Sequence, residues 1–248
     1  MIDRRRLILG SGSALLLGGC DRLNGNPVFR DVLRSAEGLT MRAGRLMSDR
    51  AALAREFGEA DMSPVFRSNG TRLPDTAPYG RHLADGFANY RLRVDGLVAR
   101  PLSLSLAQIR ARPIRAQITR HDCVEGWSAI GKWHGVPLGL LLKEASLSTR
   151  ARFVVFHCMD ELGGRPYYES IDLVDAFHPQ TILAWGMNNR VLDVPHGAPL
   201  RLRVERQLGY KHAKYVERIE AVESLAGIHG GRGGFWEDSG DYEWYGGI

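Results

Sequence analysis

The feature that most constrains the fold is a strand pattern that runs into a lone cysteine. In the run that begins at Ile114, apolar residues alternate with polar ones, and Ala116 and Ile118 continue the apolar series. A period of two is typical of a half-buried β-strand, which we expect to end near Arg120. Cys123 then falls in the first irregular backbone after the strand, where a rigid scaffold holds functional side chains.

The neighbours of Cys123 leave two interpretations of its thiol open. Arg120 and His121 supply positive charge and hydrogen-bond donors, which favour a thiolate. Asp122 and Glu125 oppose one. A thiolate can bind a soft metal or act as a nucleophile. The alternative is a small apolar side chain in the core, which is what most lone cysteines are.

Length and composition bound the class of protein. The chain has 248 residues, 44% hydrophobic and 25% charged, which suits a globular protein of one or two domains. A net charge of +5 suits an anionic cofactor or substrate, but the basic residues are spread along the chain, so nucleic-acid binding is not indicated. The three cysteines lack the spacings of a disulfide scaffold, covalent c-type haem, zinc or iron–sulfur sites. We expect Cys158 to be a buried free thiol.

Residues 1–20 have the pattern of an export signal. A basic cluster at residues 4–6 precedes a short, uncharged, mostly apolar run at residues 7–19. The cluster resembles a twin-arginine signal, and residues 17–20 (Leu-Gly-Gly-Cys) resemble a lipobox in which Cys20 is lipidated. We therefore predict a periplasmic lipoprotein attached to a bacterial membrane through Cys20. An uncleaved signal anchor is the alternative.

Residues 21–62 are predicted to form a linker and a helical arm. Turn-forming residues precede Val28, and apolar residues such as Val32, Leu33 and Leu46 then recur among arginines and acids. No catalytic constellation appears in this segment, so we expect an arm that packs on the main domain, residues 63–248.

Several blocks carry a resemblance to a known family. Residues 123–128 (Cys-Val-Glu-Gly-Trp-Ser) and 133–138 (Trp-His-Gly-Val-Pro-Leu) resemble the cysteine segment of the sulfite-oxidase and methionine-sulfoxide-reductase family of molybdopterin enzymes. Residues 195–204 and the loop 209–215 resemble the part of that family that holds the cofactor. The resemblance implies an α+β, mainly β fold of the sulfite-oxidase type, in a single catalytic domain.

The resemblance also implies roles for individual residues. The cofactor would be molybdenum–molybdopterin, with Cys123 as the protein ligand of the metal. The pterin and its phosphate would be bound by residues of three blocks: Arg67, Asn69, His196, Arg201, His212, Ala213 and Lys214. A guanidinium would bind the phosphate through paired hydrogen bonds, and an ammonium would add a point charge. From the residues alone, Arg201 and Lys214 could instead be solvated, and residues 67–69 could be a plain surface turn.

The implied activity is two-electron oxygen-atom transfer on a sulfoxide, sulfite or similar oxo substrate, either small or protein-bound. Tyr242 would face the metal, with Tyr245 as the alternative, and Arg120 and His121 would orient the substrate. We expect a monomer that exchanges electrons with a membrane or soluble cytochrome. Two other classes stay open: an exported molybdopterin-binding protein without turnover, and a cysteine hydrolase that uses Cys123 and a histidine.

Overall fold

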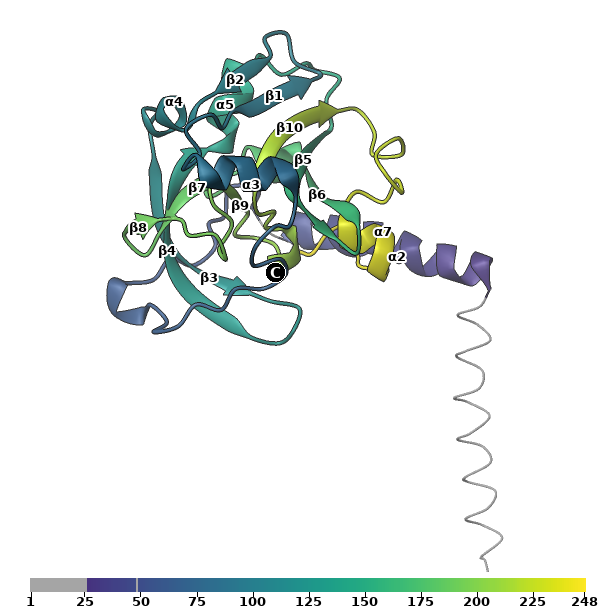
Figure 1. The fold of residues 1–248 in the computed structure, drawn as a ribbon. Coiled ribbons are helices and arrows are strands. Elements are labelled where there is room, and N and C mark those ends of the chain that lie inside the picture. Colours follow the sequence, from purple (N-terminus) through teal and green to yellow (C-terminus); the bar gives the residue numbers. More distant parts are fainter. Residues whose placement is uncertain (1–25, 48) are drawn as a thin grey trace, which may run out of the picture. The chain divides into compact units, whose positions relative to one another are not determined.

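The computed structural model describes residues 26–47 and 49–248, and the chain divides into two units (Figure 1). The predicted export signal, including Cys20, lies outside the described residues. The first unit ends at Asp49 and contains helix α2 (Pro27–Met47). The second unit is Arg50–Ile248, so residues 50–62 of the predicted arm belong to it. Among the described residues, no helix has the length and apolar character needed to cross a bilayer.

Two five-stranded, mostly antiparallel sheets form the frame of the second unit. One has the order β2-β1-β10-β5-β6, in which β1 and β10 are parallel. Its strands are β1 (Leu92–Gly96), β2 (Leu102–Leu104), β5 (Phe153–Leu162), β6 (Arg165–Asp172) and β10 (Val216–Val222). The other has the order β3-β4-β7-β8, with β9 also paired to β7. Its strands are β3 (Arg115–Asp122), β4 (Ser128–Pro137), β7 (Ile182–Met187), β8 (Arg190–Val191) and β9 (Arg201–Arg203). The predicted α+β, mainly β architecture is confirmed.

Short helices connect the strands. They are η1 (Glu59–Asp61), α3 (Ala77–Ala84), α4 (Leu106–Arg110), α5 (Leu138–Glu144), α6 (Leu173–Ala176), η2 (Gly209–Lys211) and α7 (Phe235–Gly240). Three begin at side-chain caps, because Thr76, Ser105 and Asp172 accept backbone N–H groups at the starts of α3, α4 and α6.

Strand β3 confirms the predicted strand but reverses its expected faces. The apolar face of such a strand is ordinarily the buried one. Here Ile114 is 54% exposed, whereas Gln117, Thr119 and His121 are at most 2% exposed. The polar face is buried because it meets polar partners inside the protein. Gln117 Nε2, for example, donates to Glu205 Oε1 at 2.8 Å.

Strand β9 is buried on both faces. Leu202 is fully buried, and the side chains on the other face, Arg201 and Arg203, are also at most 2% exposed. Lys214 is 8% exposed. The alternative in which Arg201 and Lys214 are solvated is therefore wrong. Since buried cations are costly without partners, their contacts decide what this region does.

Candidate active site

Cys123 occupies the turn of the β3–β4 hairpin. The strands pair up to Asp122 and Ser128, and the Cys123 backbone N–H donates to the Trp127 carbonyl at 2.9 Å. The N–H of Gly126 donates back to the Cys123 carbonyl at 3.0 Å, with φ of +84° at Gly126. This backbone angle favours glycine. The hairpin thus fixes the thiol in a tight turn, with the residue 8% exposed.

A cavity of about 400 Å³ opens beside the cysteine. Five chain segments contribute to it: the turn 69–71, the hairpin turn 123–125, the ends of β5 and β6, the η2 region and the C-terminal segment. The lining residues are Asn69, Gly70, Thr71, Cys123, Val124, Glu125, Asp160, Leu162, Tyr167, Gly209, Tyr210, His212, Lys214, Trp236 and Tyr242. The fold therefore brings together residues that are as much as 173 positions apart in the sequence, between Asn69 and Tyr242.

Asn69 is the side chain that reaches the thiol. Its Nδ2 lies 3.8 Å from Cys123 Sγ. Burial raises the pKa of the Cys123 thiol above its ordinary value. Within the described chain, Sγ hydrogen-bonds to this amide rather than to a histidine. The site therefore lacks the cysteine–histidine contact that activates the nucleophile of a hydrolase.

Two buried histidines, His121 and His212, lie with their rings perpendicular and their centroids 5.0 Å apart, and His212 lines the cavity. His212 Nε2 faces the Gln207 carbonyl at 3.0 Å, which places the proton on Nε2 and leaves Nδ1 as an acceptor. Arg203 donates to His121 Nδ1 at 3.0 Å, so His121 carries its proton on Nε2. Burial, assisted by Arg203, lowers the pKa of both histidines well below 6.5 and keeps them neutral.

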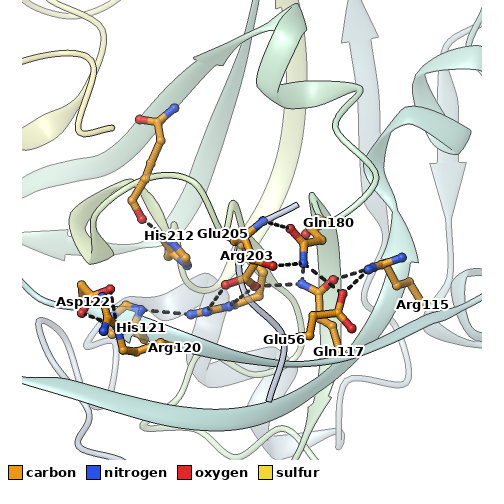
Figure 2. Close-up of polar contacts among 12 residues, drawn as sticks. Glu56, Arg115, Gln117, Arg120, His121, Asp122, Gln180, Arg203, Glu205 and His212 are labelled. Carbon is orange, nitrogen blue, oxygen red and sulfur yellow. Dashed lines mark hydrogen bonds and ion pairs between the residues drawn. The ribbon is translucent and has the colours of Figure 1, made fainter. Parts of the chain in front are cut away.

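His121 is held by a polar network that crosses the second sheet. Figure 2 shows Arg203 between the His121 ring and Glu205. Arg203 donates to both carboxylate oxygens of Glu205, at 2.9 and 2.6 Å, and all of these groups are buried. Gln117 extends the network from Glu205 to the Gln180 carbonyl at 3.0 Å. The ion pair compensates the buried charges and fixes the orientation of the His121 ring.

Lys214 lines the cavity and connects two chain segments at its rim. Its ammonium donates to the carbonyls of Asn69 (2.7 Å), Thr71 and Pro195 (3.0 Å). Burial lowers the pKa of Lys214 to about 7, and the three carbonyl acceptors favour the charged form. The lysine therefore joins the turn that carries Asn69 to the segment before β9, and supplies positive charge to the cavity.

Arg201 lies deeper. Its guanidinium stacks over Trp133, with Cζ 4.9 Å from the ring centroid, and Nη1 donates to the His196 carbonyl at 3.0 Å. Burial lowers the pKa of Arg201 to about 9. His196 itself contacts Asp193 Oδ1 at 2.6 Å and the Phe66 carbonyl at 3.1 Å. Both side chains are thus held by contacts with residues outside the cavity lining.

The predicted site residues fall into three groups. Five line the cavity: Asn69, Cys123, His212, Lys214 and Tyr242. Five are buried or half-buried outside its lining: His121, His196, Arg201, Ala213 and Tyr245. Two are exposed and outside the lining: Arg67 and Arg120.

Arg120 requires a correction. Its side chain is 57% exposed, pairs with Asp122 and lines a separate cavity of about 360 Å³ with Phe57 and Ile130. Because side chains alternate along a strand, Arg120 and its neighbour His121 point to opposite faces of β3. Arg120 is therefore not placed to orient a substrate beside Cys123.

The lining residues that were not predicted from the sequence include three polar ones: Asp160, Tyr167 and Tyr210. Asp160 ends the buried part of β5, and burial raises its pKa to about 6. Its position near the end of a mostly apolar strand segment, four residues after the run 153–156, was a usable signal. The two tyrosines have no such signal, because only the fold brings β6 and η2 together, through the Tyr167 hydroxyl and the Tyr210 carbonyl at 3.0 Å.

Comparison with known proteins gives a consistent result. The sequence matches the family "oxidoreductase molybdopterin binding domain" over residues 80–226. A candidate protein-methionine-sulfoxide reductase subunit, YedZ1, from Azospira oryzae is 34% identical over 240 residues, covering 94% of this chain and 85% of that protein. The protein-methionine-sulfoxide reductase catalytic subunit MsrP of Xanthomonas campestris pv. campestris is 30% identical over 236 residues, covering 90% and 71%. The solved structure of the sulfane dehydrogenase SoxCD from Paracoccus pantotrophus aligns with 60% of this chain and 45% of that chain. The TM-score of this alignment is 0.49, and the sequence identity is 23%.

Proposed function

The chain belongs to the family of oxidoreductases with a molybdopterin-binding domain, and from that membership we propose that it reduces sulfoxides, with methionine sulfoxide in proteins as the substrate. The predicted family, the oxidoreductase class and the molybdenum–molybdopterin cofactor are confirmed by the family match and the two relatives. The substrate is proposed because both relatives carry the name of protein-methionine-sulfoxide reductase subunits.

The residues around the cavity fit this cofactor. The single observation that carries the assignment is Cys123, a soft sulfur ligand that lines the cavity. Three buried nitrogen atoms of this region have no hydrogen-bond partner among the described residues: His121 Nε2, His212 Nδ1 and Arg201 Nε. Buried polar atoms are nearly always satisfied, so these atoms suit a polar ligand. We propose that Cys123 binds the metal and that His212 and Lys214 hold the pterin.

The cofactor supplies the two-electron chemistry, by which a sulfoxide, two electrons and two protons give a thioether and water. The protein contributes positioning and exclusion of water. Trp236 and Tyr242 stack at 5.6 Å, and Tyr210 meets Tyr242 edge-on at 5.1 Å. These rings form an apolar wall that suits the thioether side of a methionine. The Tyr242 hydroxyl is the proposed donor to the sulfoxide oxygen.

The other two classes receive less support. A cysteine hydrolase needs a base at the thiol, and Asn69 occupies that place. For a binding protein without turnover, no feature of the cavity gives particular support. The electron donor is proposed to be a cytochrome of the same compartment.

Paired cysteine variants test the function. Cys123 and Cys158 are both free and buried, but only Cys123 belongs to the cavity lining. In the holoenzyme, Cys123→Ser should retain most of the pterin, change the molybdenum spectrum and abolish reduction of methionine sulfoxide by a reduced viologen dye. Cys158→Ser should keep the native spectrum and the native turnover per folded molecule. A native spectrum and native turnover in Cys123→Ser would end the proposal.

We also propose the location predicted from the sequence, a periplasmic lipoprotein attached through Cys20. Cys20→Ser should then move the protein from the membrane fraction to a soluble or unprocessed pool. Membrane attachment with unchanged electrophoretic mobility would contradict the lipid assignment.

A further inference from the structure

Helix α2 carries a continuous apolar stripe. Val28, Leu39 and Leu46 are 11 and 7 residues apart, close to three and two turns at 3.6 residues per turn, so they line up on one face. Their side chains are 70%, 64% and 87% exposed, and Met47, which is 84% exposed, lies about 100° further round the helix. The exposed apolar residues thus span about 100° of the helix circumference, the width of the face that an amphipathic helix ordinarily covers, which indicates a surface with a binding role.

The charged residues of the helix give it a net positive charge. The 21 residues of α2 include four arginines and two acidic residues, which gives 4 − 2 = +2. Measured from Val28 at about 100° per residue, Arg42 lies at about −40°, Arg45 at about −100° and Glu37 at about 180°. All three therefore fall outside the sector from Val28 to Met47, with Arg42 at its border. An apolar face beside an arginine-rich polar face is the pattern of helices that lie in the plane of a membrane surface.

We propose that α2 binds the surface of a bilayer that contains anionic lipids. The apolar stripe would enter the boundary between headgroups and acyl chains, and the arginines would lie near the lipid phosphates. The inference depends on the geometry of α2 and not on the proposed enzymatic function. It agrees with the predicted lipid on Cys20, seven residues before Pro27, because both groups would engage the same membrane.

An environment-sensitive fluorophore tests the orientation of the helix. The fluorophore is attached to the full-length chain through a new cysteine, either Met47→Cys on the apolar side of the helix or Gly38→Cys on the polar side. Both variants carry Cys20→Ser, and the Cys20→Ser protein without a new cysteine is the labelling control. With vesicles containing about one third anionic lipid, the probe at 47 should shift to the blue and be quenched by acyl-chain quenchers. The probe at 38 should stay in water. Equal, aqueous spectra at both positions on vesicle-bound protein would overturn the proposal.

Partition measurements test the stripe itself. Leu39→Gln and Leu46→Gln should each weaken vesicle binding roughly tenfold, because each removes one buried leucine side chain from the lipid. Leu53→Gln and Leu73→Gln are matched controls, since these leucines are 54% and 61% exposed but belong to the second unit, and their binding should not change. Unchanged binding of the Leu39/Leu46 double variant overturns the proposal. A blue shift of the fluorophore at position 47 that appears without lipid and disappears on dilution would also overturn the proposal, because a second copy of the chain would then cover the stripe.

Discussion

Lys211 offers a direct test of how the C-terminal segment is attached to the active site. Its Nζ lies 2.6 Å from Glu169 Oε2 and 2.5 Å from Glu237 Oε1, and all three side chains are at most 1% exposed. Lys211 belongs to η2 and Glu237 to α7, and both elements contribute residues to the cavity. The ion triad therefore fastens α7, which carries Trp236, to the wall formed by η2. Lys211→Met removes the charge at similar side-chain length.

The expected loss follows from burial. Without Lys211, two carboxyl groups face each other in the core, and removal of one partner from a buried ion pair costs about 3–5 kcal/mol. For a chain of this size, that corresponds to a fall in Tm of roughly 6–20 °C. Arg150 and Glu223 form a control pair at the comparable distance of 2.7 Å, but their side chains are 70% and 54% exposed. Arg150→Met should therefore cost at most about 1 kcal/mol.

Urea and thermal unfolding of the two variants measure the difference. A third variant, with Lys211→Met, Glu169→Gln and Glu237→Gln together, should recover part of the loss, because no unpaired charge remains in the core. Equal stabilities for Lys211→Met and Arg150→Met would refute the reasoning from burial. A triple variant no more stable than Lys211→Met would show that packing, rather than unpaired charge, accounts for the loss.

Three further outcomes are expected. Gly135→Ala should destabilise the protein by several kcal/mol in urea unfolding, because a Cβ there would lie 2.1 Å from the Leu183 carbonyl oxygen. The control is Gly80→Ala in α3, where a Cβ would meet nothing within 4 Å and the alanine should stabilise the helix by about 0.5–1 kcal/mol. Burial raises the pKa of Glu169 well above 4.5 despite Lys211, so its contribution to stability is complete below pH 4.5 and is lost as pH rises through the folded-state pKa. Glu169→Gln should thus flatten the fall in stability as the pH rises above 4.5, measured by urea unfolding across a pH series. Lys214→Ala should lower the pterin content of purified protein, measured by fluorescence after oxidation, because three hydrogen bonds to the cavity rim are lost; full pterin content would contradict this.

The sequence was informative where local chemistry decides the structure. The alternation after Ile114 predicted β3, because a period of two is a local property of the sequence. Strand β4 was not predicted, although Trp133 within it is fully buried. Five of its ten residues are buried, and its glycines and proline obscure the pattern. Its contacts with β7, including the close approach at Gly135, come from residues about 50 positions away.

The faces of β3 show why the site was only partly predictable. Hydrophobicity placed the wrong face of this strand inward, because the buried face is a polar one whose partners, Arg203 and Glu205, belong to β9 and the residues that follow it. The same parity decides the chemistry at the end of the strand. With Gln117 and Thr119 buried, His121 must also point inward, while Arg120 points outward. Burying a polar face is costly without hydrogen-bond partners, and here the Arg203–Glu205 ion pair supplies them to Gln117 and His121. A long-range ion pair, rather than the local pattern, therefore determines which neighbour of Cys123 points inward.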